Sequence, residues 1–252
     1  SMLAQFVNVF YGIVDRMYIG HIPHVGDLAL AGVGVCGPIV TLISSFAFLV
    51  GLGGAPLMAI RLGEKNKEGA QKILANAFLM LCVLALLLTG AALLLKKPML
   101  MAFGASGATY GYANEYMTIY VLGTLFAILS VGLNQYIICQ GYSTMGMATV
   151  IIGAILNVLL DPVFIFLLGL GVRGAALATV ISQGISAVLC LIYMIRHYPI
   201  LHMKQDEWKP DGRMLRTLCG MGIPMGLQYS ITAIGSVVLQ TAVNSLGSMA
   251  VA

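Results

Sequence analysis

The stretch GAILNVLLDPVFIF, residues 153–166, is apolar almost throughout, yet it contains Asn157 and Asp161, and a proline directly follows the acid. Such an apolar segment is typical of a helix that crosses a membrane, where an ionised side chain is costly. An acid in that position needs partners inside the protein and indicates a functional site. Whether the segment lies in a membrane depends on the rest of the chain.

The composition predicts an all-α membrane protein. Of the 252 residues, 60% are hydrophobic and only 9% are charged, and the mean hydropathy is +0.96. A soluble domain carries roughly 25% charged residues. No charge falls within 28–60, 116–160 or 174–195, and about 20 apolar residues suffice for a spanning helix. Since these runs do not alternate between apolar and polar residues, a transmembrane barrel is excluded.

The apolar runs predict a polytopic helical bundle with seven spans. We place them near residues 1–22, 28–60, 73–95, 116–139, 145–168, 174–195 and 215–242. The second run is longer than a bilayer core of about 30 Å requires, so this helix must tilt, kink or project into water. Pro38 and Pro56 are its natural kink points. Because the chain begins inside an apolar segment, we expect the first helix to be incomplete.

Lysine and arginine are unevenly divided between the two sets of loops. Those after the second and sixth spans hold Arg61, Lys65, Lys67, Lys72, Arg196, Lys204, Lys209, Arg213 and Arg216. The opposite side holds Arg16, Lys96, Lys97 and Arg173. Positive residues favour the cytoplasm, so we expect a protein of the cytoplasmic membrane with a cytoplasmic N-terminus. This orientation argues against a seven-span receptor, which needs an outside N-terminus.

Nothing in the sequence favours an enzyme or a nucleic-acid-binding protein. The net charge of +4 is explained by the membrane orientation, and the five cysteines are isolated, without metal or disulfide spacing. The chain has no phosphate loop and no paired nucleophile and base. We therefore expect no catalysis, no cofactor and no nucleic-acid partner.

Asp15 and Asp161 are the only acids well inside the predicted spans. Asn157 precedes Asp161 by four residues, so both side chains lie on one helical face. Pro162 cannot donate to the carbonyl of Val158, which leaves another oxygen free near that face. Such discontinuities in transporters coordinate Na⁺ or H⁺, and the segment predicts a site for either ion. Asn157 could equally join two helices by hydrogen bonds, and Asp15 could pair with Arg16.

Four further polar residues of the predicted spans are weaker candidates for a functional role. They are Tyr116, Asn134, Gln135 and Thr179. We interpret each first as a hydrogen-bonding group between helices.

Seven different segments follow one another along the chain in a characteristic order and spacing. They are VDRMYIG (14–20), LALAGVG (28–34), RLGEKN (61–66), CQGYSTMGM (139–147), NVLLDPVFIF (157–166), GVRGAALATVISQ (171–183) and GIPMGLQ (222–228). Together they resemble the multidrug and toxic compound extrusion (MATE) family of antiporters. The segment around Asp161, followed by GAALAT, is the most specific part of this resemblance.

The resemblance implies two six-helix lobes around a central cavity, and export of drugs or other cationic or amphipathic compounds driven by Na⁺ or H⁺. In one branch of the family an Asp, an Asn, an Asp and a Thr bind the cation. The matching residues here are Asp15, Asn157, Asp161 and Thr179. Tyr116, Asn134, Gln135 and Gln228 are candidates for lining the substrate cavity. A lipid-linked oligosaccharide flippase is the alternative, although its cavity should be strongly basic.

The resemblance also predicts the domain organisation. Residues 1–195 would form the N-terminal six-helix lobe, 196–214 a cytoplasmic linker, and 215–252 the first helix of a second lobe whose remainder is absent. Another family branch carries an acid near the position of Thr232, so a second cation site there is not expected. At full length we expect a monomer surrounded by membrane lipid, with small drugs or organic cations as its partners.

Overall fold

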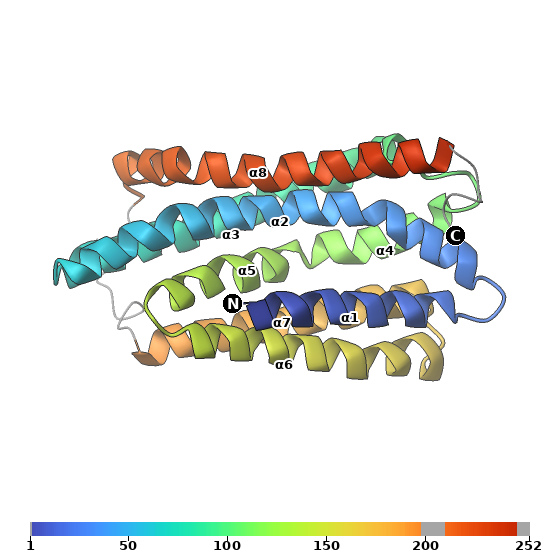
Figure 1. The fold of residues 1–252 in the computed structure, drawn as a ribbon, viewed down its shortest axis with the longest axis horizontal. Coiled ribbons are helices and arrows are strands. Elements are labelled where there is room, and N and C mark those ends of the chain that lie inside the picture. Colours follow the sequence, from blue (N-terminus) through green and yellow to red (C-terminus); the bar gives the residue numbers. More distant parts are fainter. Residues whose placement is uncertain (1, 198–209, 246–252) are drawn as a thin grey trace.

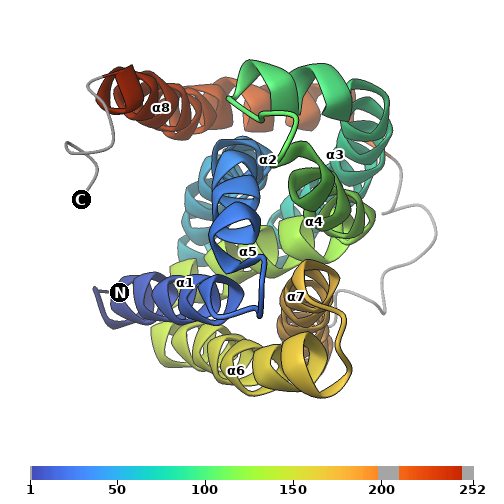
Figure 2. The ribbon, with the colours of Figure 1, turned by 90° about the vertical axis from the view of Figure 1, so that its right-hand side faces the viewer.

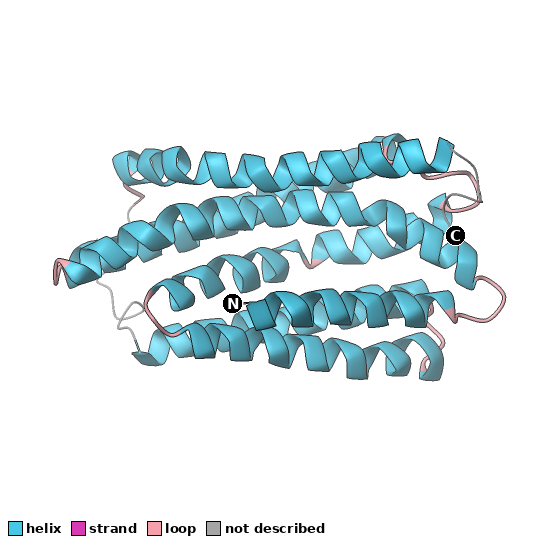
Figure 3. Ribbon diagram, viewed as in Figure 1, coloured by secondary structure: helices cyan, strands magenta, loops and turns pink. Residues whose placement is uncertain are grey.

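The computed structural model describes residues 2–197 and 210–245. Within these residues every regular element is a helix (Figure 3), which confirms the predicted all-α class. The elements are α1 (Met2–Gly20), α2 (Gly26–Gly63), α3 (Lys67–Ala102), α4 (Tyr110–Leu122), α5 (Thr124–Cys139), α6 (Ser143–Pro162), a π-helical turn η1 (Val163–Leu167), α7 (Val172–His197) and α8 (Gly212–Ser245). Lys204 and Lys209 of the predicted linker lie outside the described residues.

Four of the described helices are long and apolar enough to cross a membrane, or five if the bent pair α4–α5 is one span. They are α2, α3, α6 with η1, and α7. Helices α1 and α8 occupy the positions of the first and seventh predicted spans but are not among them. In α1, polar residues such as Asp15 and Arg16 interrupt the apolar sequence. The chain is a multi-pass membrane protein.

Helix α2 is the central element of the bundle. It packs against α3, α4, α5 and α8, and more lightly against α1. In the end-on view, α1, α6 and α7 lie on one side of α2, while α8 lies on the other (Figure 2). Helix α6 packs on α1, α5 and α7. Helix α2 is continuous through both Pro38 and Pro56.

The predicted span 116–139 corresponds to two helices in the structure, α4 and α5. The span begins earlier, at Tyr110, and bends by 58° between α4 and α5. The break lies at Gly123. A Cβ at this position would overlap the side chain of Val180 on α7, so the close packing of the break against α7 requires a glycine.

Pro162 changes the helix type without unwinding the chain. It is the last residue of α6, and the backbone continues directly into the π-helical turn η1. A proline removes the hydrogen bond to the preceding turn. Pi-helical turns are rare and occur mostly as single turns within α-helices. The predicted discontinuity is therefore a local widening of the helix.

Helix α8 joins the bundle through a tight antiparallel contact with α2, which we call the α2–α8 seam (Figure 1). A Cβ on Gly53 would lie 2.7 Å from the Cα of Gly222, and a Cβ on Gly222 would overlap the carbonyl oxygen of Leu49. Farther along, the rings of Phe48 and Tyr229 stack with centroids 4.2 Å apart. Small residues allow this close backbone approach between helices in a membrane.

Helix α8 also makes polar contacts with α2 and with α3. Near the middle of α8, the hydroxyls of Ser45 and Ser230 lie 3.0 Å apart. At the start of α8, the backbone N–H of Asp211 donates to Oδ1 of Asn76 on α3 at 2.9 Å. The Asp211 carboxylate then accepts from the N–H of Arg213 at 2.9 Å and caps the helix.

The seam predicts that Gly222 is far less tolerant of a side chain than its neighbour Gly220. Gly222→Ala should lower the melting temperature of the purified protein, because overpacking costs about 1–3 kcal/mol. Gly220→Ala is the matched control, since nothing lies within 4 Å of a Cβ built there. A thiol-reactive dye assay in detergent measures both. Equal melting temperatures for the two variants would contradict the close approach.

Candidate functional site

Asp15 of α1 and Asp161 of α6 meet inside the bundle. Their exposed fractions are 9% and 0%, and the two carboxyl groups are close enough to interact directly with each other. Helices α1 and α6 pack side by side, which brings the two acids together. The neighbouring Arg16 is exposed, and its guanidinium group lies near Gly37 of α2.

Asn157 and Thr179 complete the cluster from α6 and α7. Asn157 is 2% exposed and lies one turn before Asp161. Its Nδ2 donates to Oγ1 of Thr179 at 3.3 Å, and Thr179 in turn donates to the carbonyl of Ala175 at 3.0 Å. The amide thus turns its nitrogen towards Thr179 and leaves its oxygen free. We call Asp15, Asn157, Asp161 and Thr179 the carboxylate cluster.

The cluster contains several buried oxygen atoms without hydrogen-bonding partners. They are Oδ1 of Asp15, Oδ1 of Asn157, and both Oδ1 and Oδ2 of Asp161. A buried polar atom left without a partner costs free energy, and each case needs an explanation such as an ion or water.

A small hard cation fits this set of groups. Carboxylate, amide and hydroxyl oxygens are the ligands that such ions prefer. No group of three or more His, Cys, Asp or Glu side chains suited to a metal occurs in the described part of the chain. Two acids supplemented by neutral oxygens favour a monovalent ion over a transition metal.

Two tyrosines border the carboxylate cluster. Tyr116 on α4, predicted for the substrate cavity, interacts with Asp15 and with Thr179. Tyr11 on α1 interacts with both Asp15 and Asp161. We did not predict a role for Tyr11 from the sequence. Its position four residues before Asp15 was a usable signal, since residues at this spacing share one helical face.

The other predicted cavity residues do not gather around the carboxylate cluster. Asn134 on α5 is buried and donates to the carbonyl of Gly146 at 2.8 Å and to Oγ1 of Thr149 at 2.9 Å. It therefore joins α5 to α6, as we first interpreted it. Gln135 packs against Gly51 of α2. Gln228 is exposed on α8.

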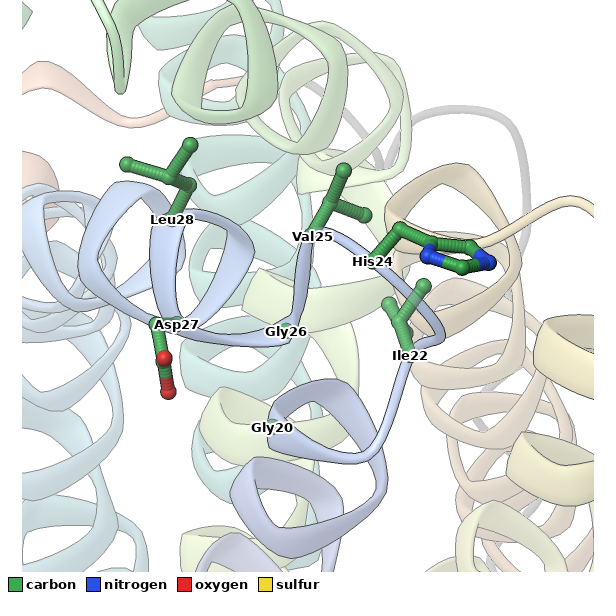
Figure 4. Close-up of a pocket in the computed structure, with 7 residues that line it drawn as sticks. All are labelled: Gly20, Ile22, His24, Val25, Gly26, Asp27 and Leu28. Atoms are coloured by element: carbon green, nitrogen blue, oxygen red, sulfur yellow. The ribbon is translucent and has the colours of Figure 1, made fainter.

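A pocket at the turn between α1 and α2 brings no reactive groups together. It is lined by Gly20, Ile22, His24, Val25, Gly26, Asp27 and Leu28. The imidazole of His24 and the carboxylate of Asp27 point in different directions (Figure 4). The carboxylate cluster lies elsewhere, and no member of it lines this pocket.

Fold and site together define a polytopic helical membrane protein with a buried acidic centre, and comparison with known proteins places it more closely. Residues 1–163 match the MatE family. Since this is well over half of the sequence, the chain belongs to the MatE family, which confirms the resemblance that the sequence predicted.

Individual relatives agree with this assignment. The multidrug export protein MepA of Staphylococcus haemolyticus is 28% identical over 251 residues, covering 100% of this chain and 55% of the relative. A solved structure that bears the name protein A has 32% identity and a TM-score of 0.88, over 98% of this chain and 55% of its own.

Another solved structure is described as an inward-facing multidrug resistance MATE family transporter of the MOP superfamily. It has 25% identity and a TM-score of 0.82, covering 89% of this chain and 50% of its own. The chain spans about half the length of the curated relative and of both structures.

If the orphaned oxygens hold a cation, that cation should stabilise the folded protein. The melting temperature should rise when Na⁺ replaces choline at equal ionic strength, because a ligand at ten times its Kd contributes about 1.4 kcal/mol. Asp161→Asn should abolish this rise. Asp27→Asn, which changes an exposed acid, should retain it. An equal rise in both variants would contradict binding at the cluster.

Proposed function

We propose that the protein is part of a multidrug exporter that works as an antiporter. In this mechanism the entry of Na⁺ or H⁺ into the cell drives the export of drugs by alternating access. The observation that carries this proposal is the pair Asp15 and Asp161, buried together with orphaned oxygens. An acid buried in a membrane bundle is typical of an ion pathway. The name of the relative MepA, a multidrug export protein, supports drugs as the cargo.

The cluster offers a physical means of coupling. Without a cation, the carboxylates of α1 and α6 repel each other at short range. A bound Na⁺ or proton removes this repulsion and favours closer packing of the two helices. Because a ligand shifts an equilibrium only through its different affinities for the two states, the change in packing between α1 and α6 is what would carry the coupling.

Asn157 and Thr179 have a positioning role in this mechanism. The Thr179 hydroxyl is fixed by its hydrogen bond to Ala175, and it holds the amide nitrogen of Asn157. The amide oxygen is thereby available to the ion beside Asp161. The cluster needs no catalytic group, and we expect a transporter without enzymatic activity.

The charge distribution supports the proposed orientation in the cytoplasmic membrane. The α2–α3 turn, the end of α7 and the start of α8 lie at the same end of the bundle (Figure 1). This end carries Arg61, Lys65, Lys67, Lys72, Arg196, Arg213 and Arg216. Positive residues favour the cytoplasm, so this end would face inward and α1 would begin on the same side.

The proposed substrates are drugs or organic cations that a monomeric, full-length protein takes up in a cavity between two lobes. Helix α8 would be the first helix of the second lobe, and the α2–α8 seam would be part of the contact between lobes. The name of the relative MepA, a multidrug export protein, favours these substrates over lipid-linked oligosaccharides.

Asp161→Asn tests the proposal directly. In the full-length protein this variant should lose at least tenfold in ion-driven dye efflux, because one of the paired charges is gone. Its membrane insertion and yield should remain unchanged, since asparagine fills nearly the same volume. Asp27→Asn should keep normal efflux. Unchanged efflux by Asp161→Asn would refute the assignment of the cluster as the coupling site.

The coupling ion is identified by imposing one gradient at a time. In proteoliposomes, an inward Na⁺ gradient at equal pH and a proton gradient without Na⁺ should be compared for dye transport. We expect one of the two to drive efflux in the wild type, and neither to drive it in Asp161→Asn.

A further inference from the structure

Arg16 carries a positive charge within the first predicted span, and it is exposed. Two other arginines, Arg61 and Arg173, hold glutamates in ion pairs of 2.9 and 2.8 Å. Arg16 makes no such pair with any acid of residues 2–197 and 210–245. Its charge acts on the neighbouring Asp15, but that carboxyl group belongs to the buried cluster. The guanidinium group of Arg16 is therefore available to a ligand.

This guanidinium group lies deep along the bundle. A Cβ built on Gly37 of α2 would be 3.9 Å from Nη2 of Arg16. Eleven residues separate Gly37 from Gly26, where α2 begins, and at 1.5 Å per residue this is about 17 Å. Half of a hydrocarbon core is about 15 Å. Because a helical side chain leans towards the helix N-terminus, Arg16 extends away from the α1–α2 turn and towards the middle of the membrane.

A guanidinium group at this depth is costly against lipid. Arginines near the end of a span usually avoid this cost by extending to the headgroups, and the direction of Arg16 does not allow that. The exposed face of α1 and α2 around Arg16 therefore needs water or an anionic group beside it.

Glycines leave open space around the Arg16 guanidinium group. Gly12 shares a face of α1 with Arg16, four residues away, and a Cβ built on it would meet no described atom within 4 Å. The same holds, among the described residues, for Gly34, which lies one turn before Gly37 on α2. Unlike the glycines of the α2–α8 seam, these do not serve close helix packing. Glycine weakens a helix relative to alanine, and it suits places where a ligand approaches the backbone.

We propose that Arg16 binds the carboxylate group of an exported compound in the open space beside three glycines, and we call the group the arginine site: Gly12, Arg16, Gly34 and Gly37. This inference rests on the proposed function and names the chemical class of the cargo. That class is an amphipathic compound with a carboxylate group attached to its apolar or cationic part.

The chemistry of a guanidinium group favours this ligand. Its planar donors bind a carboxylate through two parallel hydrogen bonds. A lipid phosphate offers similar acceptors, but phosphates lie in the headgroup region, outside the hydrocarbon core. At the depth of Gly37, an anionic group has to belong to a compound that enters the protein.

Two dyes that differ by one methyl group test the arginine site. One is a rhodamine with a free carboxylate, and the other is the methyl ester of the same rhodamine. Binding of each dye to the purified full-length protein is measured by fluorescence polarisation. Arg16→Gln should raise the Kd of the carboxylate dye about tenfold, the size expected for a lost hydrogen bond to a charged group. The Kd of the ester should stay the same.

Two further variants control for charge. Arg16→Lys should recover part of the affinity for the carboxylate dye, because lysine keeps the charge and lacks the planar fork. Lys97→Gln removes an exposed positive charge from α3 and should leave both Kd values unchanged. An equal effect of Arg16→Gln on the two dyes, or a wild type that does not bind the carboxylate dye, would overturn the proposal.

The open space is tested by filling it. Gly34→Leu should weaken binding of the carboxylate dye, because the new side chain occupies the space beside Arg16. Gly90→Leu is the matched control, since Gly90 is another glycine of a long apolar helix and has no described atom within 4 Å of its Cβ position. Unchanged binding in Gly34→Leu would count against the arginine site.

These measurements need no ion gradient, so they separate the arginine site from the proposed antiport. If gradient-driven efflux fails while Arg16→Gln weakens only the carboxylate dye, the antiport is refuted and the arginine site stands. If the protein exports both dyes and Arg16→Gln affects them equally, the arginine site alone is refuted.

Discussion

Two carboxyl groups brought together in an apolar interior are the constraint on which the rest of this structure depends. Exposing Asp15 and Asp161 to hydrocarbon would be costly, and the packing of helices α1, α6 and α7 keeps both side chains buried within the protein. Burying a charge costs several kcal/mol unless it finds partners, and the structure supplies only some of them. In the proposed antiporter, a bound ion would supply the partners that the orphaned oxygens of the cluster lack. The cost of burying the two acids would then be offset only while the ion is bound.

Much of the fold follows from the sequence, because each uncharged run must satisfy its backbone internally and so becomes a helix. The helix ends and breaks are less predictable. Glycine at position 123 reads as an ordinary small residue within an apolar run. The 58° bend occurs there, and the residue that requires a glycine at this point, Val180, is distant in sequence. The π turn after Pro162 is hidden for a similar reason, since a proline predicts a fault in the helix without specifying how the fault is absorbed.

The candidate site was predictable to a different extent for each residue. Asp15 and Asp161 are conspicuous because acids are rare in membrane spans, and Asn157 follows from helical spacing. Thr179 required the family resemblance, because a threonine in a span usually bonds to its own helix, and this one also does so. Tyr11 was not predicted, although it lies four residues before Asp15 and so shares its helical face. Its position beside Asp161 comes from the packing of α1 against α6.

Helix α2 faces α8 on one side and α1 on the other (Figure 2), and the tightness of packing differs between these two sides. Towards α8 it presents Gly53 to the Gly222 backbone at a distance that leaves no room for compression. Such a contact either stays closed or parts as a whole, because packed interiors rearrange between discrete states and do not deform continuously. Towards α1 the contact is slight, so in the proposed antiporter α1 would have room to respond to the charge at Asp15. If the protein exchanges an ion for a drug, the weak side allows local adjustment to the ion. The stiff side would then convert a change in α2 into the separation of two lobes.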